Sequence, residues 1–316
     1  MNPDEMTSIP TPPVGFKSGF IAIIGRPNVG KSTIMNYLVG QKIAITSPVA
    51  QTTRNRLRGI LTTSEAQIIF LDTPGIHKPH HQLGKVLVTN AQNAINSVDL
   101  VLFVVDSSVV AGGGDRFIAD FLSKSITETP VILGLNKQDQ QPDDQEEITE
   151  IDRTYAQMAD IHEWPIIKFS ALTGWGMDNL LALFKAKLPN GPYYYPPDLV
   201  TDQPERFIMG ELIREQILHL TREEIPHSVA VGIERVEESP EITRVLATIY
   251  VERDSQKGIM IGKKGSMLKQ IGIAAREQMQ KLINGKIYLE MFVKVQPKWR
   301  QSRDFLTDFG YRIERD

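Results

Sequence analysis

Short runs of apolar and β-branched residues alternate with longer amphipathic segments over residues 19–190. This alternation is typical of βαβ units around a mostly parallel sheet. We therefore expect an α/β domain with helices on both faces of its sheet. The predicted strands are Ile21–Gly25, Gly59–Leu61, Ala66–Asp72, Leu100–Asp106, Pro130–Asn136 and Pro165–Ser170.

The periodic pattern stops at a proline-rich segment. Four of the ten residues from Leu188 to Pro197 are proline, which marks a linker. The first residues are also proline-rich and contain few apolar anchors. We expect a flexible leader at 1–18, a first domain at 19–190, a linker at 191–204 and a second domain with a C-terminal tail at 205–316.

The second domain has a different pattern, in which helices and alternating strands follow the order α-β-β-α-β. This order predicts a small α+β domain. Its expected elements are a helix at Glu205–Leu220, strands at Val229–Glu238 and Thr243–Glu252, a helix at Met267–Leu282 and a strand at Ile287–Val295.

Composition narrows the class of protein. The chain has 316 residues, 41% of them apolar and 23% charged, which is ordinary for a globular protein of about two domains. It has no cysteine, which excludes disulfides and thiolate metal sites. The apolar run from Leu100 to Val105 is far shorter than the roughly 20 residues that span a bilayer. With no secretory signal pattern either, we expect a cytoplasmic protein.

The segment Gly25–Ser32 matches the phosphate-binding P-loop and lies between a predicted strand and a helix-like segment. Its glycines let backbone N–H groups face phosphate oxygens, and the following helix directs its positive N-terminus at the anion. Lys31 can reach the β- and γ-phosphates, and Ser32 can ligate Mg²⁺. The residues predicted to hold a nucleoside triphosphate here are Gly25, Asn28, Val29, Gly30, Lys31, Ser32 and Thr33.

Asp72 ends the predicted strand Ala66–Asp72 and is followed by Thr73, Pro74 and Gly75. Alone, this would be an ordinary turn. After a P-loop at this distance, a carboxylate at the carboxyl end of a strand is suited to organise Mg²⁺, and Gly75 can donate its backbone N–H to the γ-phosphate.

The segment from Asn136 to Asp139 closes another buried strand. A carboxylate at Asp139 can accept two hydrogen bonds from guanine that adenine cannot supply, so the segment favours GTP over ATP. Ser170 ends the last predicted strand, where a backbone amide could meet the guanine oxygen. The predicted base-binding residues are Asn136, Lys137, Asp139, Ser170, Ala171 and Leu172.

In these motifs and their order, residues 19–190 resemble the translation-factor class of small P-loop GTPases. The resemblance implies a threonine of the first switch that responds to Mg²⁺ and the γ-phosphate; we favour Thr53, with Thr52 as the alternative. It thus implies a catalytic set of Lys31, Thr53, Asp72 and Gly75, with Mg²⁺ bound by Ser32, Thr53 and Asp72.

Two positions bear on the mechanism. Ile76 stands where Ras-like enzymes carry the glutamine that orients the attacking water, so we expect slow intrinsic turnover. Asn28 is similar to the asparagine that some relatives use to coordinate K⁺ near the phosphates. Its other interpretation is an amide that stabilises the loop.

The second domain carries a basic loop, Gly262–Gly265, with Lys263 and Lys264 between the glycines. Between Arg253 and Arg303 there are 12 Lys or Arg against three acidic residues, a local charge of +9 that favours a polyanion. The loop and the element order resemble a KH domain of the bacterial αββ type, which implies binding of single-stranded RNA. The predicted RNA-binding residues are Gly258, Ile261, Gly262, Lys263, Lys264, Gly265, Lys269, Lys298, Trp299 and Arg300. Trp299 could stack on a base or pack in the core.

A GTPase domain joined to one C-terminal KH domain resembles the Era family of bacterial ribosome-assembly GTPases over nearly the whole chain. The resemblance implies binding of the 3′ end of small-subunit ribosomal RNA and of the small ribosomal subunit. It also implies peripheral contact with the inner membrane, and we expect a monomer. The alternative is an RNA-binding module whose nucleotide domain acts as a switch with negligible hydrolysis.

Overall fold

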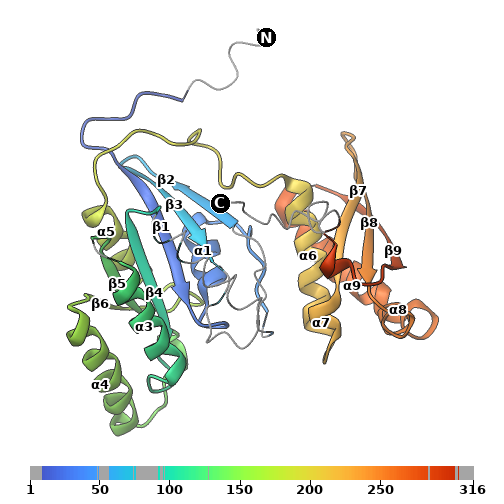
Figure 1. Ribbon diagram of the computed structural model, residues 1–316. Helices are drawn as coiled ribbons and strands as arrows, with labels where there is room; N and C mark the ends of the chain where they lie inside the picture. The colour runs from blue at the N-terminus through green and yellow to red at the C-terminus, as the bar shows by residue number, and fades with distance from the viewer. Residues whose placement is uncertain are drawn as a thin grey trace. The chain divides into compact units, whose positions relative to one another are not determined.

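A computed structural model of the chain describes residues 9–47, 49, 57–73, 75, 92, 95, 97–126, 128–283, 285–302 and 305. The chain forms two compact units. In Figure 1, the strands and helices of the first are coloured from blue to yellow-green, and those of the second from yellow to red. The first comprises Met1–Ile43 and Arg56–Asp202, and the second comprises Ala44–Asn55 and Gln203–Asp316.

The first unit contains a six-stranded sheet in the order β2-β3-β1-β4-β5-β6. β2 is antiparallel to β3, and the other neighbours are parallel. The central strands are rich in aliphatic residues because helices cover both of their faces. The strands are β1 (Lys17–Gly25), β2 (Leu57–Thr62), β3 (Ala66–Asp72), β4 (Leu100–Asp106), β5 (Val131–Asn136) and β6 (Ile166–Lys168).

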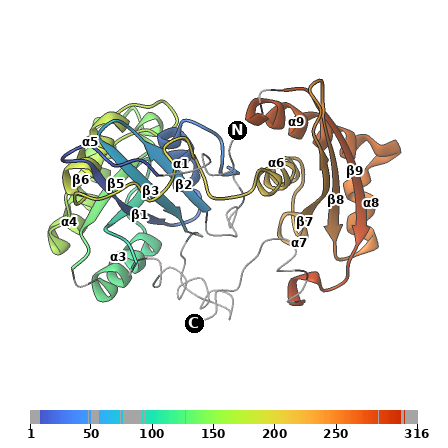
Figure 2. The same ribbon diagram turned by 90° about the horizontal axis from the view of Figure 1, so that it is seen from above.

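Helices α3 and α4 cover one face of this sheet, and α1 and α5 lie on the other (Figure 2). On the first face, Ile118 of α3 and Tyr155 of α4 are buried with Phe103 of β4 in one apolar cluster. On the second, Phe184 of α5 packs against Phe70 of β3 with ring centroids 5.9 Å apart. The predicted α/β class is therefore confirmed. These helices are α1 (Lys31–Val39), α3 (Gly113–Ser125), α4 (Gln145–His162) and α5 (Met177–Lys187), with a 3₁₀ turn at Gln138–Gln140.

Most of the segment predicted as a linker, up to Asp202, belongs to the first unit. The side-chain carbonyl of Gln67 in β3 accepts hydrogen bonds from the backbone N–H groups of Tyr194 and Tyr195, at 2.7 and 3.0 Å. Thr201 donates its hydroxyl to the carbonyl of Arg58, at 2.7 Å. The domain boundaries expected from the sequence, with a linker at 191–204, stay a prediction.

The second unit has a three-stranded sheet, β7-β8-β9, in which β7 is antiparallel and β9 parallel to β8. The predicted α+β order is present, with two additional short helices, α7 and α8. α8 escapes the sequence pattern because it is only eight residues long and combines polar residues with a glycine. The elements are α6 (Glu205–Leu220), α7 (Ile225–Ser228), β7 (Ala230–Glu237), β8 (Thr243–Val251), α8 (Asp254–Ile261), a 3₁₀ turn (Lys263–Gly265), α9 (Ser266–Ile283), β9 (Ile287–Val295) and a 3₁₀ turn (Trp299–Gln301).

Within the described ranges, no helix is both long enough and apolar enough to cross a membrane.

Candidate nucleotide-binding and RNA-binding sites

The P-loop connects the end of β1 at Gly25 to the start of α1 at Lys31. Gly30 caps α1 with a φ of 98°, a left-handed conformation that favours glycine. A Cβ atom at this position would lie 2.3 Å from the side-chain nitrogen of Asn136. The loop therefore depends on glycine for its conformation and for its close approach to Asn136 at the end of β5.

Lys31 is buried, and its ammonium group donates to the backbone carbonyls of Gly25 and Arg26, at 3.1 and 2.8 Å. Burial lowers the pKa of Lys31 to about 8, while the nearby Asp72 carboxylate acts in the opposite direction. The lysine is thus held inside the loop by two neutral acceptors. A triphosphate would offer it a charged acceptor instead.

Ser32 and Asp72 are brought together across 40 residues of sequence, with the Ser32 hydroxyl donating to Asp72 Oδ2 at 2.9 Å. Asp72 is fully buried at the end of β3. A hydroxyl and a carboxylate are hard oxygen ligands of the kind Mg²⁺ prefers, with phosphate oxygens and water completing its shell. In the described part of the chain, no group of three or more His, Cys, Asp or Glu side chains could hold a metal. The Ser32–Asp72 pair fits a Mg²⁺ ion that is bound with a nucleotide, because the phosphates supply further oxygen ligands.

Gly75 lies against the P-loop. A Cβ atom at Gly75 would come within 2.7 Å of the backbone nitrogen of Pro27, so this close approach requires glycine. The placement is consistent with a backbone contact to the terminal phosphate. Thr53, its alternative Thr52, and Ile76 lie outside the described residues.

Asn136 bridges three predicted motifs. Its side-chain amide donates to the carbonyl of Val29 at 2.8 Å, and its side-chain carbonyl accepts from the backbone N–H of Ala171 at 3.0 Å. Ser170 donates its hydroxyl to Asp139 Oδ1 at 2.5 Å, which orients that carboxylate. The structure therefore joins the end of β5 to the P-loop, and joins both the end of β5 and the segment after it to the turn after β6. Leu172, in that turn, is 71% exposed.

Two ion pairs near this site were missed by sequence reasoning. Lys137 pairs with Asp106 Oδ2 at 2.5 Å, and burial of Asp106 is outweighed by hydrogen bonds from Lys137 and Ser108, so the pKa of Asp106 is lowered. Arg26 Nε pairs with the buried Asp115 Oδ1 at 2.6 Å. Asp106 ends β4 at the same sheet edge as Asp72, and that position was a usable signal. For Asp115 the sequence offered no such signal, because its partner Arg26 is 89 residues away.

In the second unit, the predicted RNA loop has the geometry of a sharp turn. Gly262 and Gly265 have φ of 71° and 78°, and Lys264 between them is also left-handed, at 54°. Lys263 and Lys264 are both exposed. The glycines leave the backbone accessible, and the two ammonium groups can meet phosphates in solution.

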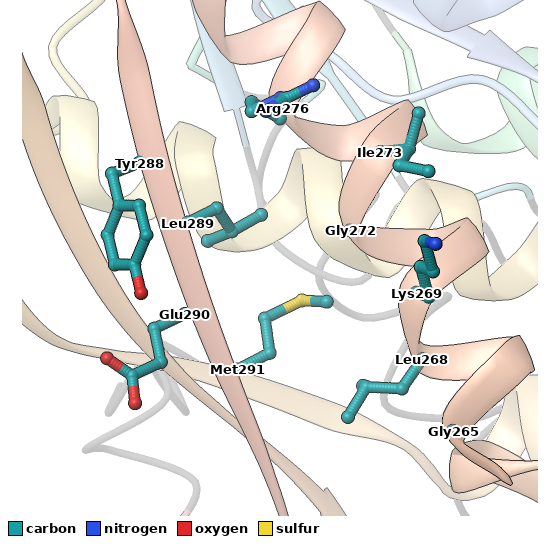
Figure 3. Close-up of a pocket in the computed structure, with 10 residues that line it drawn as sticks. All are labelled: Gly265, Leu268, Lys269, Gly272, Ile273, Arg276, Tyr288, Leu289, Glu290 and Met291. Carbon is teal, nitrogen blue, oxygen red and sulfur yellow. The ribbon is translucent and has the colours of Figure 1, made fainter.

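A groove of about 440 Å³ begins at this loop and runs between α9 and β9 (Figure 3). From β9, Leu289 and Met291 point toward α9, whereas Tyr288 and Glu290 lie on the other side of the strand. The α9 wall carries Lys269, which was predicted, and Arg276, which was not. The residues contributed by α9 and the loop are Gly265, Leu268, Lys269, Gly272, Ile273 and Arg276.

Trp299 needs a correction among the RNA-binding residues. It is 1% exposed, and its indole N–H donates to the backbone carbonyl of Ser228 at 2.9 Å. A buried ring cannot stack on a base, so of the two interpretations the structure supports core packing. Its neighbour Arg300 forms an ion pair with Glu252 at 2.5 Å.

The remaining predicted RNA-binding residues are Lys298, Gly258 and Ile261. Lys298 has a left-handed φ of 55° directly before Trp299. Gly258 and Ile261 belong to α8, which leads into the glycine loop.

Comparisons with known proteins identify the family of each domain. A family described as 50S ribosome-binding GTPase matches residues 20–137, and a KH domain family matches residues 224–300. The chain is 71% identical over 314 residues to GTPase Era of Rippkaea orientalis, covering 99% of this chain and 98% of that protein. The chain belongs to the Era family of GTPases. Era of Nostoc sp. is 72% identical over 307 residues, covering 97% and 93%.

Two solved Era structures match the whole fold. A variant of Aquifex aeolicus Era bound to GDP and AlF₄⁻ is 37% identical with a TM-score of 0.86, covering 94% of this chain and 100% of that one. Era in complex with MgGDPNP and nucleotides 1506–1542 of 16S ribosomal RNA matches with a TM-score of 0.85, at the same identity and coverage. The predicted Era resemblance and GTPase activity are therefore confirmed.

Proposed function

We propose that this Era-family GTPase binds small-subunit ribosomal RNA near its 3′ end and aids maturation of the small ribosomal subunit. The observation that carries the proposal is the groove between α9 and β9, which begins at the loop of Lys263 and Lys264 and bears Lys269 and Arg276 on one wall. The solved Era complex with 16S ribosomal RNA supports it. The matching family description mentions the 50S subunit, but it covers only residues 20–137.

We assign GTP and GDP to the P-loop side of the first unit. Lys31 would hold the β- and γ-phosphates, Ser32 and Asp72 would hold Mg²⁺, and Asp139 would read the guanine edge. The Mg²⁺ and GDPNP in the Era complex support this assignment. Mg²⁺ bound there would neutralise charge on the phosphates. The chain's own groups would orient the phosphates through Lys31 and the backbone N–H of Gly75.

A more specific proposal is that Asn28 coordinates K⁺ near the phosphates. Asn28 has a left-handed φ of 64° and follows Pro27, the residue that Gly75 approaches. An amide oxygen at this point of the P-loop is a suitable K⁺ ligand. The test is GTPase turnover in K⁺ against Na⁺ at equal ionic strength; equal rates would contradict the proposal.

The monomeric state and peripheral membrane contact are proposals of the same kind, carried by the family resemblance alone. Light scattering of the purified chain tests the first, and a dimer mass would overturn it. Sedimentation with anionic lipid vesicles tests the second, and absence of the protein from the pellet would overturn it.

The RNA site is tested by charge reversal in the loop. Lys263→Asp with Lys264→Asp should weaken binding of a ribosomal RNA fragment strongly and flatten its salt dependence, because phosphate contacts are lost. Guanine-nucleotide affinity should be retained. Lys281→Asp with Lys286→Asp is the matched control, since it makes the same charge change in the last turn of α9 and directly before β9. Equal losses from both pairs would show that only overall charge matters.

A further inference from the structure

A second groove, of about 580 Å³, lies in the first unit away from the nucleotide site. It is lined by the last residues of α3 and α4 and by the start of β5 at Val131. The P-loop follows the carboxyl end of β1, Asn136 is the last residue of β5, and these strands run in the same direction. The second groove is therefore at the opposite edge of the sheet.

Two stacked rings form part of its wall. The His162 ring lies on Trp164 with centroids 4.4 Å apart and an interplanar angle of 23°. Trp164 in turn meets the buried Phe103 edge-on, with centroids 6.0 Å apart. This packing holds the indole in one orientation. Such a surface suits the planar guanidinium and aliphatic stem of an arginine.

The charges around the groove favour a cation. Glu128, Asp160 and Glu163 contribute carboxylates, and Lys187 is the single Lys or Arg among the described lining residues. Both α3 and α4 end here, so their C-terminal carbonyls add partial negative charge, about half an elementary charge per helix. The same field would repel the phosphates of RNA.

Apolar side chains beside the carboxylates point to a peptide as the ligand. Ile161 lines the groove and is 75% exposed, and the partly exposed Ile126 lines it directly after the end of α3. A small polyamine would use the charges and leave these aliphatic surfaces in water. A chain with both basic and aliphatic side chains would cover them.

We infer that this groove binds a basic peptide segment of a partner protein, with an arginine against the stacked rings of His162 and Trp164 and beside the carboxylates of Asp160 and Glu163. This goes beyond the proposed RNA binding, because the ligand is a protein and the site belongs to the other unit. Complementary charge is the physical basis, so binding should weaken as salt is raised.

The test is fluorescence anisotropy of the full-length protein with a labelled peptide that alternates arginine and leucine. Asp160→Lys with Glu163→Lys should raise the dissociation constant about tenfold or more, because two attractive contacts become repulsive. Both side chains are exposed, so folding should persist. Glu146→Lys with Glu147→Lys, on the first turn of the same helix, is the matched control and should leave peptide affinity nearly unchanged.

Four further measurements decide the interpretation. Trp164→Leu should weaken peptide binding while guanine-nucleotide affinity, which reports folding, is retained. Replacing leucine by glutamine in the peptide should also weaken binding. An equal effect of the control pair, or complete displacement of the peptide by an equal concentration of spermidine, would overturn the inference. RNA affinity should be the same in the Asp160/Glu163 variant as in the original protein.

Discussion

The side-chain amide of Asn136 donates to the backbone carbonyl of Val29 across 2.8 Å, which bonds the end of β5 directly to the phosphate-binding loop. The other end of the same side chain accepts from Ala171. One buried amide therefore fixes the relative positions of the segments proposed to bind phosphate and base.

Replacing Asn136 by Ala should leave the carbonyl of Val29 and the N–H of Ala171 without this partner. Each unpaired buried group costs about 1–3 kcal/mol. We expect a lower thermal midpoint and weaker binding of both GTP and GDP, measured by scanning calorimetry and nucleotide titration. Asn136→Asp is the informative comparison, since it keeps the acceptor for Ala171 but loses the donor to Val29. Unchanged affinity in both variants would contradict the bridging role.

Asp139→Asn should shift preference from GTP toward xanthosine triphosphate. Xanthine presents an acceptor where guanine has its exocyclic amine, and the new amide can donate to it. The hydroxyl of Ser170, which now donates to Asp139, can still donate to the amide oxygen. Competition binding with the two nucleotides measures the shift. A variant that still prefers GTP would show that Asp139 does not read the base.

Gly75→Ala should reduce GTPase turnover more than GDP affinity. The added Cβ would lie 2.7 Å from the Pro27 nitrogen, so either the turn or the P-loop must move. Because Gly75 is proposed to meet the γ-phosphate, the loss should appear in kcat for GTP. Single-turnover hydrolysis and GDP titration separate the two effects, and normal turnover would remove Gly75 from the catalytic set.

Nucleotide-free protein should become more stable as pH rises from about 8 toward 10.5, the folded and ordinary pKa values of Lys31. In this window the unfolded chain binds more protons than the folded one, so the free energy of unfolding increases with pH, by up to about 3 kcal/mol from this group. Denaturant unfolding at several pH values in this window measures the change in the free energy of unfolding. Lys31→Met supplies the baseline, and the same slope in both proteins would contradict the assignment.

Trp299→Ala should destabilise the KH unit by about 3–5 kcal/mol, the usual cost of deleting a buried aromatic side chain. The carbonyl of Ser228 would also lose its indole partner. Denaturant unfolding of the variant, monitored by a signal from the KH unit, measures this loss of stability. A stable variant with selectively weakened RNA binding would restore the base-stacking interpretation.

The amino-acid sequence alone determined the two-domain class, the strands and the chemistry-bearing motifs. It could do so because each motif is local: the P-loop, Asp72, Asn136–Asp139 and Gly262–Gly265 each follow or precede a periodic element within a few residues. Because parallel strands place their carboxyl ends at one edge of a sheet, the sequence alone could predict that the motifs of the first domain form a common site.

Only the tertiary structure decided how these pieces touch. The contact between Asn136 and Val29 joins residues 107 positions apart, and the Arg26–Asp115 pair joins residues 89 apart. Whether Trp299 faces a base or the core depended on Ser228, 71 positions away. A local sequence pattern does not identify such distant partners, because burial and hydrogen-bond geometry arise only when separate elements pack together.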